Sequence, residues 1–410
     1  MIALILLHGR FKGEMMQFNN KWTKWLLTGL AVLILGGGLI FFGNFFAQNA
    51  GHTEQSAPSG HTKSKKKGLQ ISASNGANYK TVINDGHYKV SKARGVTASK
   101  NGNEFNMVSF ENGLLNFSKD HFSTDRYIFQ EGQYLNSDTA LDWLGRKSKD
   151  NPTGLNPADN GKTDSSRAPI YLQTLEEQDF MTQKGNDLSL AGVVVGLAMN
   201  TQDSYQKEKY GATYRQNISK QDYEREGRKI AQSVIERYRK LPGIKQNTPI
   251  IVAMYAQAPD DSLAGGNFYS WVQSTSGSQL SKWHAIDDQT VVLPMEEGTA
   301  NDKSVANELN TSFKNFTKNV QNFFPNLSSV TGQAAYHDKQ LAGLNVTVTT
   351  QFYSATEIRS FANYLAQVAP NYLPGGVPVQ IRINAATGMQ AYVTKSADST
   401  KYSVTILGSY

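Results

Sequence analysis

Residues 193–199 read VVVGLAM, and residues 250–255 read IIVAMY. Each run is short, apolar and uncharged, which is typical of a strand that is buried on both faces. Between them, the residues from about Gln221 to Leu241 carry apolar side chains at helical spacing, and Pro242-Gly243 ends the pattern. The three segments predict a strand-helix-strand unit.

The same order recurs near the C-terminus. Residues 345–351 alternate like a strand, and Ser354-Ala355-Thr356-Glu357 has the capping-box pattern that begins a helix. The helical pattern ends at Pro370, and the apolar run 379–383 predicts the returning strand. Both units open with the tripeptide Leu-Ala-Gly, which either marks an internal duplication or is a chance match. We predict an α+β fold, a mixed α/β domain with two strand-helix-strand units.

Other segments give weaker patterns. We expect helices at 110–122, 137–144, 169–180 and 303–324, a small hairpin joining 127–129 to 133–135, and C-terminal strands at 389–394 and 402–407. The polar segment 146–168 predicts a boundary between an N-terminal lobe (69–168) and a C-terminal α+β domain (169–410).

One long apolar segment lies near the N-terminus. Residues 25–46 are uncharged, and thirteen of them are Leu, Ile, Val or Phe. As a helix they would extend roughly 33 Å, and the hydrocarbon core of a bilayer is about 30 Å thick. We predict a transmembrane helix that anchors the chain in the lipid bilayer. A cleaved signal peptide is the alternative, although the apolar region is longer than is usual for one.

Charge near this segment predicts its orientation. Lys21 and Lys24 favour a cytoplasmic segment 1–24, whether translation starts at Met1, Met15 or Met16. Residues 47–68 are rich in Gly, Ser, His, Gln and Lys and predict a flexible basic linker. We therefore expect a single-pass protein of the cell membrane, with its N-terminus inside and most of the chain extracellular.

The net charge of +7 is concentrated before residue 69. Residues 1–68 hold eight basic and two acidic residues, and the remainder is nearly neutral. A neutral folded domain argues against binding to nucleic acid, which requires a basic face. The basic run of the linker would either contact anionic wall polymer or lipid or simply be solvated; it consists of Lys63, Lys65, Lys66 and Lys67. The sequence has no cysteine, which excludes disulfides and thiolate chemistry.

Polar residues follow the two buried strands of the first unit. Asn200 and Asp203 follow one strand, and Asp260 and Asp261 follow the other. Strand ends of this kind commonly form a ligand cleft, where these side chains would bind a cation or a sugar hydroxyl. The alternative is that they are turn and cap residues, a role in which Asp and Asn are common.

Trp283 and His284 form a second part of this candidate ligand cleft. Together they would provide a binding surface; the alternative is that Trp283 closes the edge of a core and His284 faces water. The histidines do not have metal-ligand spacing, and we expect neither a metal nor a cofactor. No catalytic motif is present, so we assign no catalytic residue.

Several strings in this chain resemble the CamS sex-pheromone lipoprotein family of Gram-positive bacteria. They occur in order along residues 75–410 and include FENGLLN (110–116), DRY (125–127), GQYL (132–135), GLNP (154–157), LEEQDF (175–180), VGLAMN (195–200), KEK (207–209) and WH (283–284).

The resemblance implies a surface lipoprotein precursor. In this family a lipobox cysteine becomes lipidated, and a short peptide released from the signal acts as a pheromone in conjugation. Residues 31–37, AVLILGG, are similar in pattern to such a peptide, but Gly38 stands about where the cysteine is expected. Lipid transfer needs a thiol, so we expect an uncleaved helix to replace the lipid anchor.

These inferences lead to two hypotheses for function. The first is a membrane-anchored, extracytoplasmic CamS-family protein with a non-catalytic surface or binding role. The second is a cell-envelope hydrolase that acts on wall polymer through the carboxylates of Asp203, Asp260 and Asp261.

Overall fold

The computed structural model describes residues 70–72, 76–99, 103–295, 306–323, 329–352 and 354–408. The chain divides into two compact units, Met1–Lys65 and Lys66–Tyr410, and all of the described residues belong to the second. The expected anchor (25–46) and nearly all of the expected linker (47–68) lie in the first unit, outside the described residues. Within the described ranges, no helix is both long and apolar enough to cross a membrane.

The larger of the two main sheets has nine strands, in the order β1-β2-β4-β5-β6-β9-β10-β11, with β3 paired to β2. Its strands are β1 (Gln70–Ile71), β2 (Lys80–Asn84), β3 (His87–Tyr88), β4 (Ile128–Glu131), β5 (Leu172–Lys184), β6 (Asp187–Met199), β9 (Ile250–Ala256), β10 (Asn267–Ser274) and β11 (His284–Ala285). A separate two-stranded sheet joins β7 (Gln202–Gln206) to β8 (Thr213–Asn217). Strands from both sides of residue 168 therefore lie in one sheet.

The first predicted strand-helix-strand unit is confirmed. β6 and β9 pair in parallel, and the long helix that precedes β9 is α5 (Lys220–Tyr238). Alternate residues of β6 point to opposite faces of the sheet, so Val193 and Val195 join one hydrophobic cluster and Val194 joins another. A strand buried on both faces needs apolar residues throughout, which explains the uninterrupted run.

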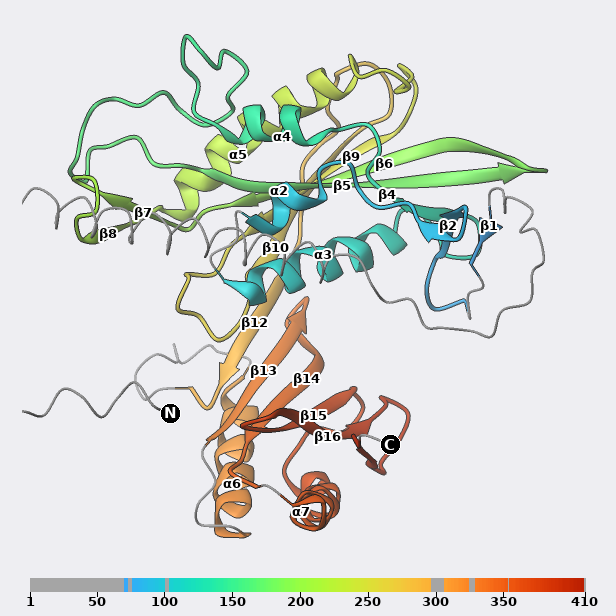
Figure 1. Ribbon diagram of the computed structural model, residues 1–410, viewed down its shortest axis with the longest axis vertical. Coiled ribbons are helices and arrows are strands. Elements are labelled where there is room, and N and C mark those ends of the chain that lie inside the picture. The colour runs from blue at the N-terminus through green and yellow to red at the C-terminus, as the bar shows by residue number, and fades with distance from the viewer. Residues whose placement is uncertain are drawn as a thin grey trace, which may run out of the picture. The chain divides into compact units, whose positions relative to one another are not determined.

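Helices cover both faces of this sheet. On one side lie α5 and α4 (Ser137–Leu144), and on the other lies α3 (Glu104–Lys119), as Figure 1 shows. A short helix, α2 (Arg94–Ser99), contacts β5 and α4. Asn103 and Asn136 cap α3 and α4 through their side chains, as expected for Asn at this position.

The second sheet has six strands, in the order β12-β13-β14-β15-β16-β17. They are β12 (Asp288–Leu293), β13 (Ser329–His337), β14 (Gln340–Thr349), β15 (Val379–Ala385), β16 (Gly388–Lys395) and β17 (Ser403–Ile406), and the helices packed with them are α6 (Asn307–Phe323) and α7 (Ala355–Val368). The parallel pair β14–β15 joined by α7 is the second predicted unit, and the capping box of Ser354 and Glu357 is present.

Two local predictions are wrong. The helix expected at 169–180 is part of the long strand β5, which pairs with β4 and β6. The hairpin expected at 127–135 does not form, because β4 pairs with β2 and β5 and the chain leaves the sheet at Gly132. In both cases the partners are distant in sequence, so the local pattern does not contain the pairing.

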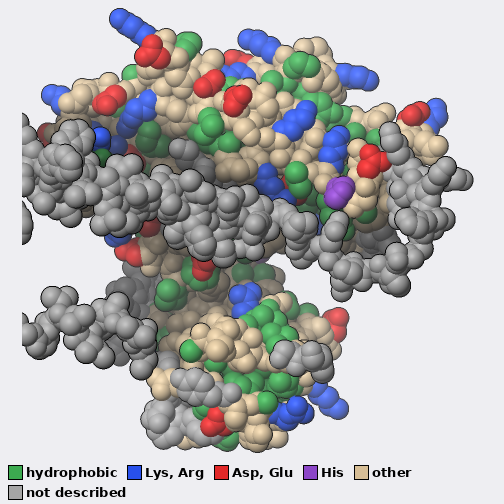
Figure 2. All heavy atoms as spheres, viewed as in Figure 1, with side chains coloured by type: hydrophobic (Ala, Val, Ile, Leu, Met, Phe, Trp, Pro, Cys, Tyr) green, Lys and Arg blue, Asp and Glu red, His purple; other side chains and the backbone are tan. Residues whose placement is uncertain are grey.

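The surface of the described part agrees with its near-neutral charge. On the face shown in Figure 2, Lys and Arg side chains are interspersed with Asp and Glu side chains. Neither sign forms a continuous patch on the visible described surface.

Candidate functional site: an acidic pocket on the larger sheet

A cavity of about 200 Å³ lies where α2, α3, β4 and β5 meet. We call it the acidic pocket, because four of its lining side chains are glutamates. It is lined by Ser91, Ala93, Arg94, Glu111, Asn112, Leu115, Phe129, Glu131, Leu175, Glu176, Glu177 and Gln178.

The early end of β4 creates the pocket. β4 stops at Glu131, and at Gly132 the chain passes so close to β5 that an added Cβ would lie 2.5 Å from Cβ of Glu177. Beyond this point β4 no longer covers the edge of β5, and the segment that leads into α2 closes the gap. The backbone N–H of Ser91 donates to Oε2 of Glu131 at 2.7 Å, which ties that segment to the end of β4.

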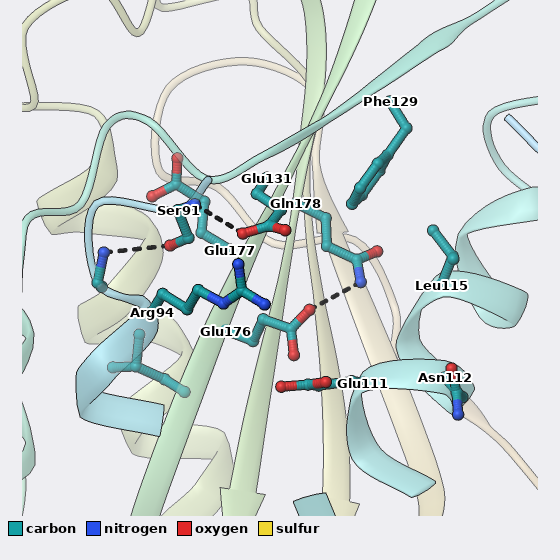
Figure 3. Close-up of a pocket in the computed structure, with 12 residues that line it drawn as sticks. Ser91, Arg94, Glu111, Asn112, Leu115, Phe129, Glu131, Glu176, Glu177 and Gln178 are labelled. Atoms are coloured by element: carbon teal, nitrogen blue, oxygen red, sulfur yellow. Dashed lines mark hydrogen bonds between the residues drawn. The ribbon is translucent and has the colours of Figure 1, made fainter. Parts of the chain in front are cut away.

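A glycine in β6 brings α3 close to the sheet. An added Cβ at Gly196 would lie 2.7 Å from Cζ of Phe110 and 2.9 Å from Cδ2 of Leu114, both in α3. Gly196 is also the partner of Glu176 in the pairing of β5 with β6. This close packing therefore holds α3, and with it Glu111, beside Glu176 (Figure 3).

Glu176 is the central group of the pocket. Its Oε1 accepts a hydrogen bond from Nε2 of Gln178 at 2.9 Å. Its Oε2 is inaccessible to solvent and has no hydrogen-bond partner among the described residues. Burial raises the pKa of Glu176 to about 7; the bond from Gln178 opposes that rise, and the charges of Glu111 and Glu131 add to it. The carboxyl therefore changes its charge near neutral pH.

Glu111 and Arg94 lie at the exposed rim of the pocket. Partial burial raises the pKa of Glu111; the positive charge of Arg94 lowers it, and the negative charge of Glu131 raises it further. Figure 3 shows the Arg94 side chain reaching from α2 toward the carboxyl groups of Glu131 and Glu176. The pocket thus gathers several carboxyl groups around one guanidinium.

Glu177, next to Glu176 in β5, has a different environment. Oε1 accepts from the backbone N–H groups of Gln133 and Tyr134, and Oε2 accepts from the N–H of Leu135 and the hydroxyl of Tyr238. Burial and the charge of Glu177 raise the pKa of nearby Asp179 well above its usual range. Glu177 thereby fixes the segment that follows β4 and has a structural role.

The structure gives Asn200 and Asp203 structural partners. The side-chain amide of Asn200 donates to the carbonyl of Ile170 and to Oε1 of Gln173, both at 3.0 Å. Asp203 is buried, forms an ion pair with Arg167 at 2.5 Å and accepts from the N–H of Ile170. Both side chains hold the segment that leads into β5.

The remaining predicted cleft residues are spread over other surroundings. Asp260 and Asp261 are exposed, and Asp261 pairs with Arg215 at 2.9 Å. Trp283 packs against the cluster that contains α5, with Arg228 over its ring. His284 stacks on Trp271 with ring centroids 4.1 Å apart, on the opposite face of the sheet. None of the six predicted residues lines the acidic pocket.

The sequence contained one sign of the acidic pocket. Residues 175–180, LEEQDF, place three carboxylates within a strand that is buried on both faces. Charged residues are rarely buried without a partner, so such a string marks either a structural network or a site. No group of three or more His, Asp or Glu side chains in the described ranges has the arrangement of a metal site.

These features define the class of protein: a mixed α/β domain with an acidic pocket on its larger sheet. The family model described as "CamS sex pheromone cAM373 precursor" matches residues 88–401. The chain therefore belongs to the CamS family.

Solved structures agree with this assignment. A sex pheromone precursor from Lactobacillus salivarius subsp. salivarius UCC118 is 51% identical, with a TM-score of 0.79 over 84% of this chain and 100% of that chain. The C-terminal domain of the sex pheromone staph-cAM373 precursor from Staphylococcus aureus is 29% identical, with a TM-score of 0.63 over 76% of this chain and 99% of that chain. No curated protein sequence matches the chain.

Proposed function

We propose that this CamS-family protein is a membrane-tethered binding protein whose acidic pocket receives a small ligand. The observation that carries the proposal is that Glu176 lines the cavity and that its buried oxygen Oε2 has no hydrogen-bond partner among the described residues. An unsatisfied buried polar atom costs about 1–3 kcal/mol. A ligand that supplies the missing donor would recover part of that free energy.

The tether is proposed from the sequence. Residues 25–46 have the length and composition of a membrane-spanning helix. The chain has no cysteine, so it lacks the thiol that a lipid anchor requires, and an uncleaved helix would perform the same task. In this arrangement the N-terminus is cytoplasmic and the domain that carries the pocket is outside the cell.

The tether is tested by fractionating cells that express the full chain. We expect the protein in the membrane pellet after a high-salt wash, its release by detergent, and digestion of its domain by protease added to intact spheroplasts. A control chain without residues 25–46 should be recovered in the soluble fraction. Recovery of the full chain in the wash, or complete protection from protease, would contradict the tether or its orientation.

The binding role is tested separately. The full chain in lipid nanodiscs is mixed with a set of small amines, carboxylates and sugars, and binding is detected by ligand-observed NMR. We expect at least one compound to bind to the wild type and not to Glu176→Gln. If no compound in the set binds in a Glu176-dependent way, the pocket is not a ligand site.

A further inference from the structure

The charge of the acidic pocket limits what it can bind. Glu177 is occupied by backbone N–H groups, so three glutamates remain facing one cation, Arg94. Glu111 and Glu131 both raise the pKa of Glu176, which shows that these carboxyl groups repel one another. An anionic ligand would add to this repulsion, and a neutral one would leave it in place. A cation relieves it.

The unpaired oxygen of Glu176 indicates which kind of cation the pocket would bind. Oε2 of Glu176 points toward Glu111 (Figure 3) and has no hydrogen-bond partner among the described residues. A primary ammonium group is compact and offers three N–H donors, so it can bond two carboxylates at once. A metal ion fits less well, because the described residues contain no group with metal-binding geometry.

One side of the pocket is apolar. Leu115 of α3 and Phe129 of β4 are both half-buried and lie on the same side of the cavity (Figure 3). An alkyl chain attached to the ammonium group would pack on these two side chains, and the ring of Phe129 would attract the cation. The volume of about 200 Å³ suits a short chain.

We infer that the acidic pocket binds a primary ammonium group on a short alkyl chain, held between Glu111 and Glu176 with the chain on Leu115 and Phe129. This inference rests on the proposed binding function and names its ligand class. A free alkylamine and the side chain of a peptide lysine share this chemistry.

Arg94 acts as a competitor within the protein. It is exposed, and its guanidinium extends toward the carboxyl groups that the ligand would use. Removing its charge should strengthen binding, whereas removing the charge of Glu176 should weaken it. Opposite effects from two neighbouring substitutions are not expected of general damage to the fold.

Binding should also depend on pH. The charged or titratable groups facing the pocket are Arg94 from α2, Glu111 from α3, Glu131 from β4, and Glu176 and Glu177 from β5. An ammonium ligand favours the ionised form of Glu176, whose pKa is raised to about 7. Affinity should therefore rise between pH 6 and pH 8, and binding at pH 6 should release a proton.

The test is titration calorimetry on the full chain in nanodiscs, at pH 6 and pH 8, with n-pentylamine, Nα-acetyl-lysine amide and 1-pentanol. We expect the two amines to bind and pentanol not to bind. Glu176→Gln should weaken amine binding at least tenfold, and Arg94→Gln should tighten it severalfold. The control variant Glu308→Gln, at an exposed position in α6, should leave amine binding unchanged. Binding of the lysine amide alone would identify a peptide as the source of the ammonium group.

Two results would overturn the inference. One is pentanol binding as tightly as pentylamine, and the other is amine binding that Glu176→Gln leaves unchanged in a variant with the wild-type circular dichroism spectrum. If no amine binds although another compound of the mixed set binds through Glu176, the ligand class is wrong and the binding function stands. If nothing binds through Glu176, both proposals fail.

Discussion

Glu176 and Glu177 are neighbours in one strand and have opposite environments. Glu177 accepts four hydrogen bonds, three of them from the backbone that follows β4. Glu176 accepts a single side-chain bond from Gln178, and its second oxygen has no described partner. Because successive strand residues face opposite sides of a sheet, the two carboxylates meet different elements: α3 on one side and the segment after β4 on the other.

These environments give the two glutamates different roles: Glu177 stabilises the fold, and Glu176 is the candidate ligand-binding group. A buried carboxylate whose oxygens are all bonded stabilises the fold, and evolution of a ligand site there would require breaking those bonds. A buried carboxylate with a free oxygen beside a cavity destabilises the fold unless something binds. Three substitutions test this contrast, and a fourth, at the exposed Asp261, serves as a comparison; they follow from the largest expected effect to the smallest.

Glu177→Ala should give the largest loss of stability. It removes the acceptor of the N–H groups of Tyr134 and Leu135 and of the hydroxyl of Tyr238, and we expect the free energy of unfolding to fall by about 3–5 kcal/mol. Urea denaturation followed by circular dichroism measures it. Glu177→Gln keeps an acceptor and should lose less. An Ala variant as stable as the wild type would refute the structural role.

Glu176→Gln should raise the free energy of unfolding at high pH, whereas Glu177→Ala lowers it. The folded protein holds the proton of Glu176 up to a pKa of about 7, against an ordinary value of 4.5, so this group favours folding fully only below about pH 4.5. That contribution is lost as pH rises to about 7. The variant should therefore match the wild type at pH 4.5 and be more stable at pH 8, by up to about 3 kcal/mol. Denaturation curves at both pH values measure this, and a variant that is less stable at pH 8 would contradict it.

Gln178→Leu should change the titration of Glu176 rather than the fold. The side-chain amide of Gln178 donates to Oε1 of Glu176 and lowers its pKa. Without that bond, the pKa of Glu176 should rise by about one pH unit. Carboxyl carbon NMR across pH 5–9 would follow it, with Gln183→Leu, an exposed position in the same strand, as the control.

Asp261→Asn should have the smallest effect. The ion pair of Asp261 with Arg215 is exposed on both sides, and exposed pairs contribute about 0–1 kcal/mol. The free energy of unfolding should change by less than about 1 kcal/mol, and high salt should abolish even that change. A larger loss of unfolding free energy in urea denaturation would show that the pair of Asp261 with Arg215 contributes more to stability than its exposure indicates.

The sequence predicted those parts of the fold whose patterns are local. The continuous apolar runs of β6 and β9, the apolar stripe of α5 and the capping box at Ser354 and Glu357 each lie within a few turns or residues of chain. Parallel pairing followed from them, because a helix between two buried strands returns the chain in the same direction.

The sequence predicted β5 and the pocket less well. Pro169 suits a first helical position and predicts a helix to about residue 180, and Glu176, Glu177 and Asp179 interrupt the apolar pattern by which β5 would be recognised as a buried strand. Four of the candidate cleft residues, Asn200, Asp203, Asp260 and Asp261, follow the ends of buried strands, whereas the acidic pocket lies beside the middle of β5. Its position depends on where β4 stops and on the close approach of α3 at Gly196.

The sequence by itself determined the family, the two strand-helix-strand units, the absence of any thiol chemistry and the apolar segment near the N-terminus. Only the tertiary structure decided that Glu111, Glu131 and Glu176, separated by up to 65 positions, share one pocket and that Glu177 does not compete with them. Local patterns record how a segment buries its own side chains. The pairing of distant strands decides which charges become neighbours, and with them the pKa of Glu176 and the chemistry of the site.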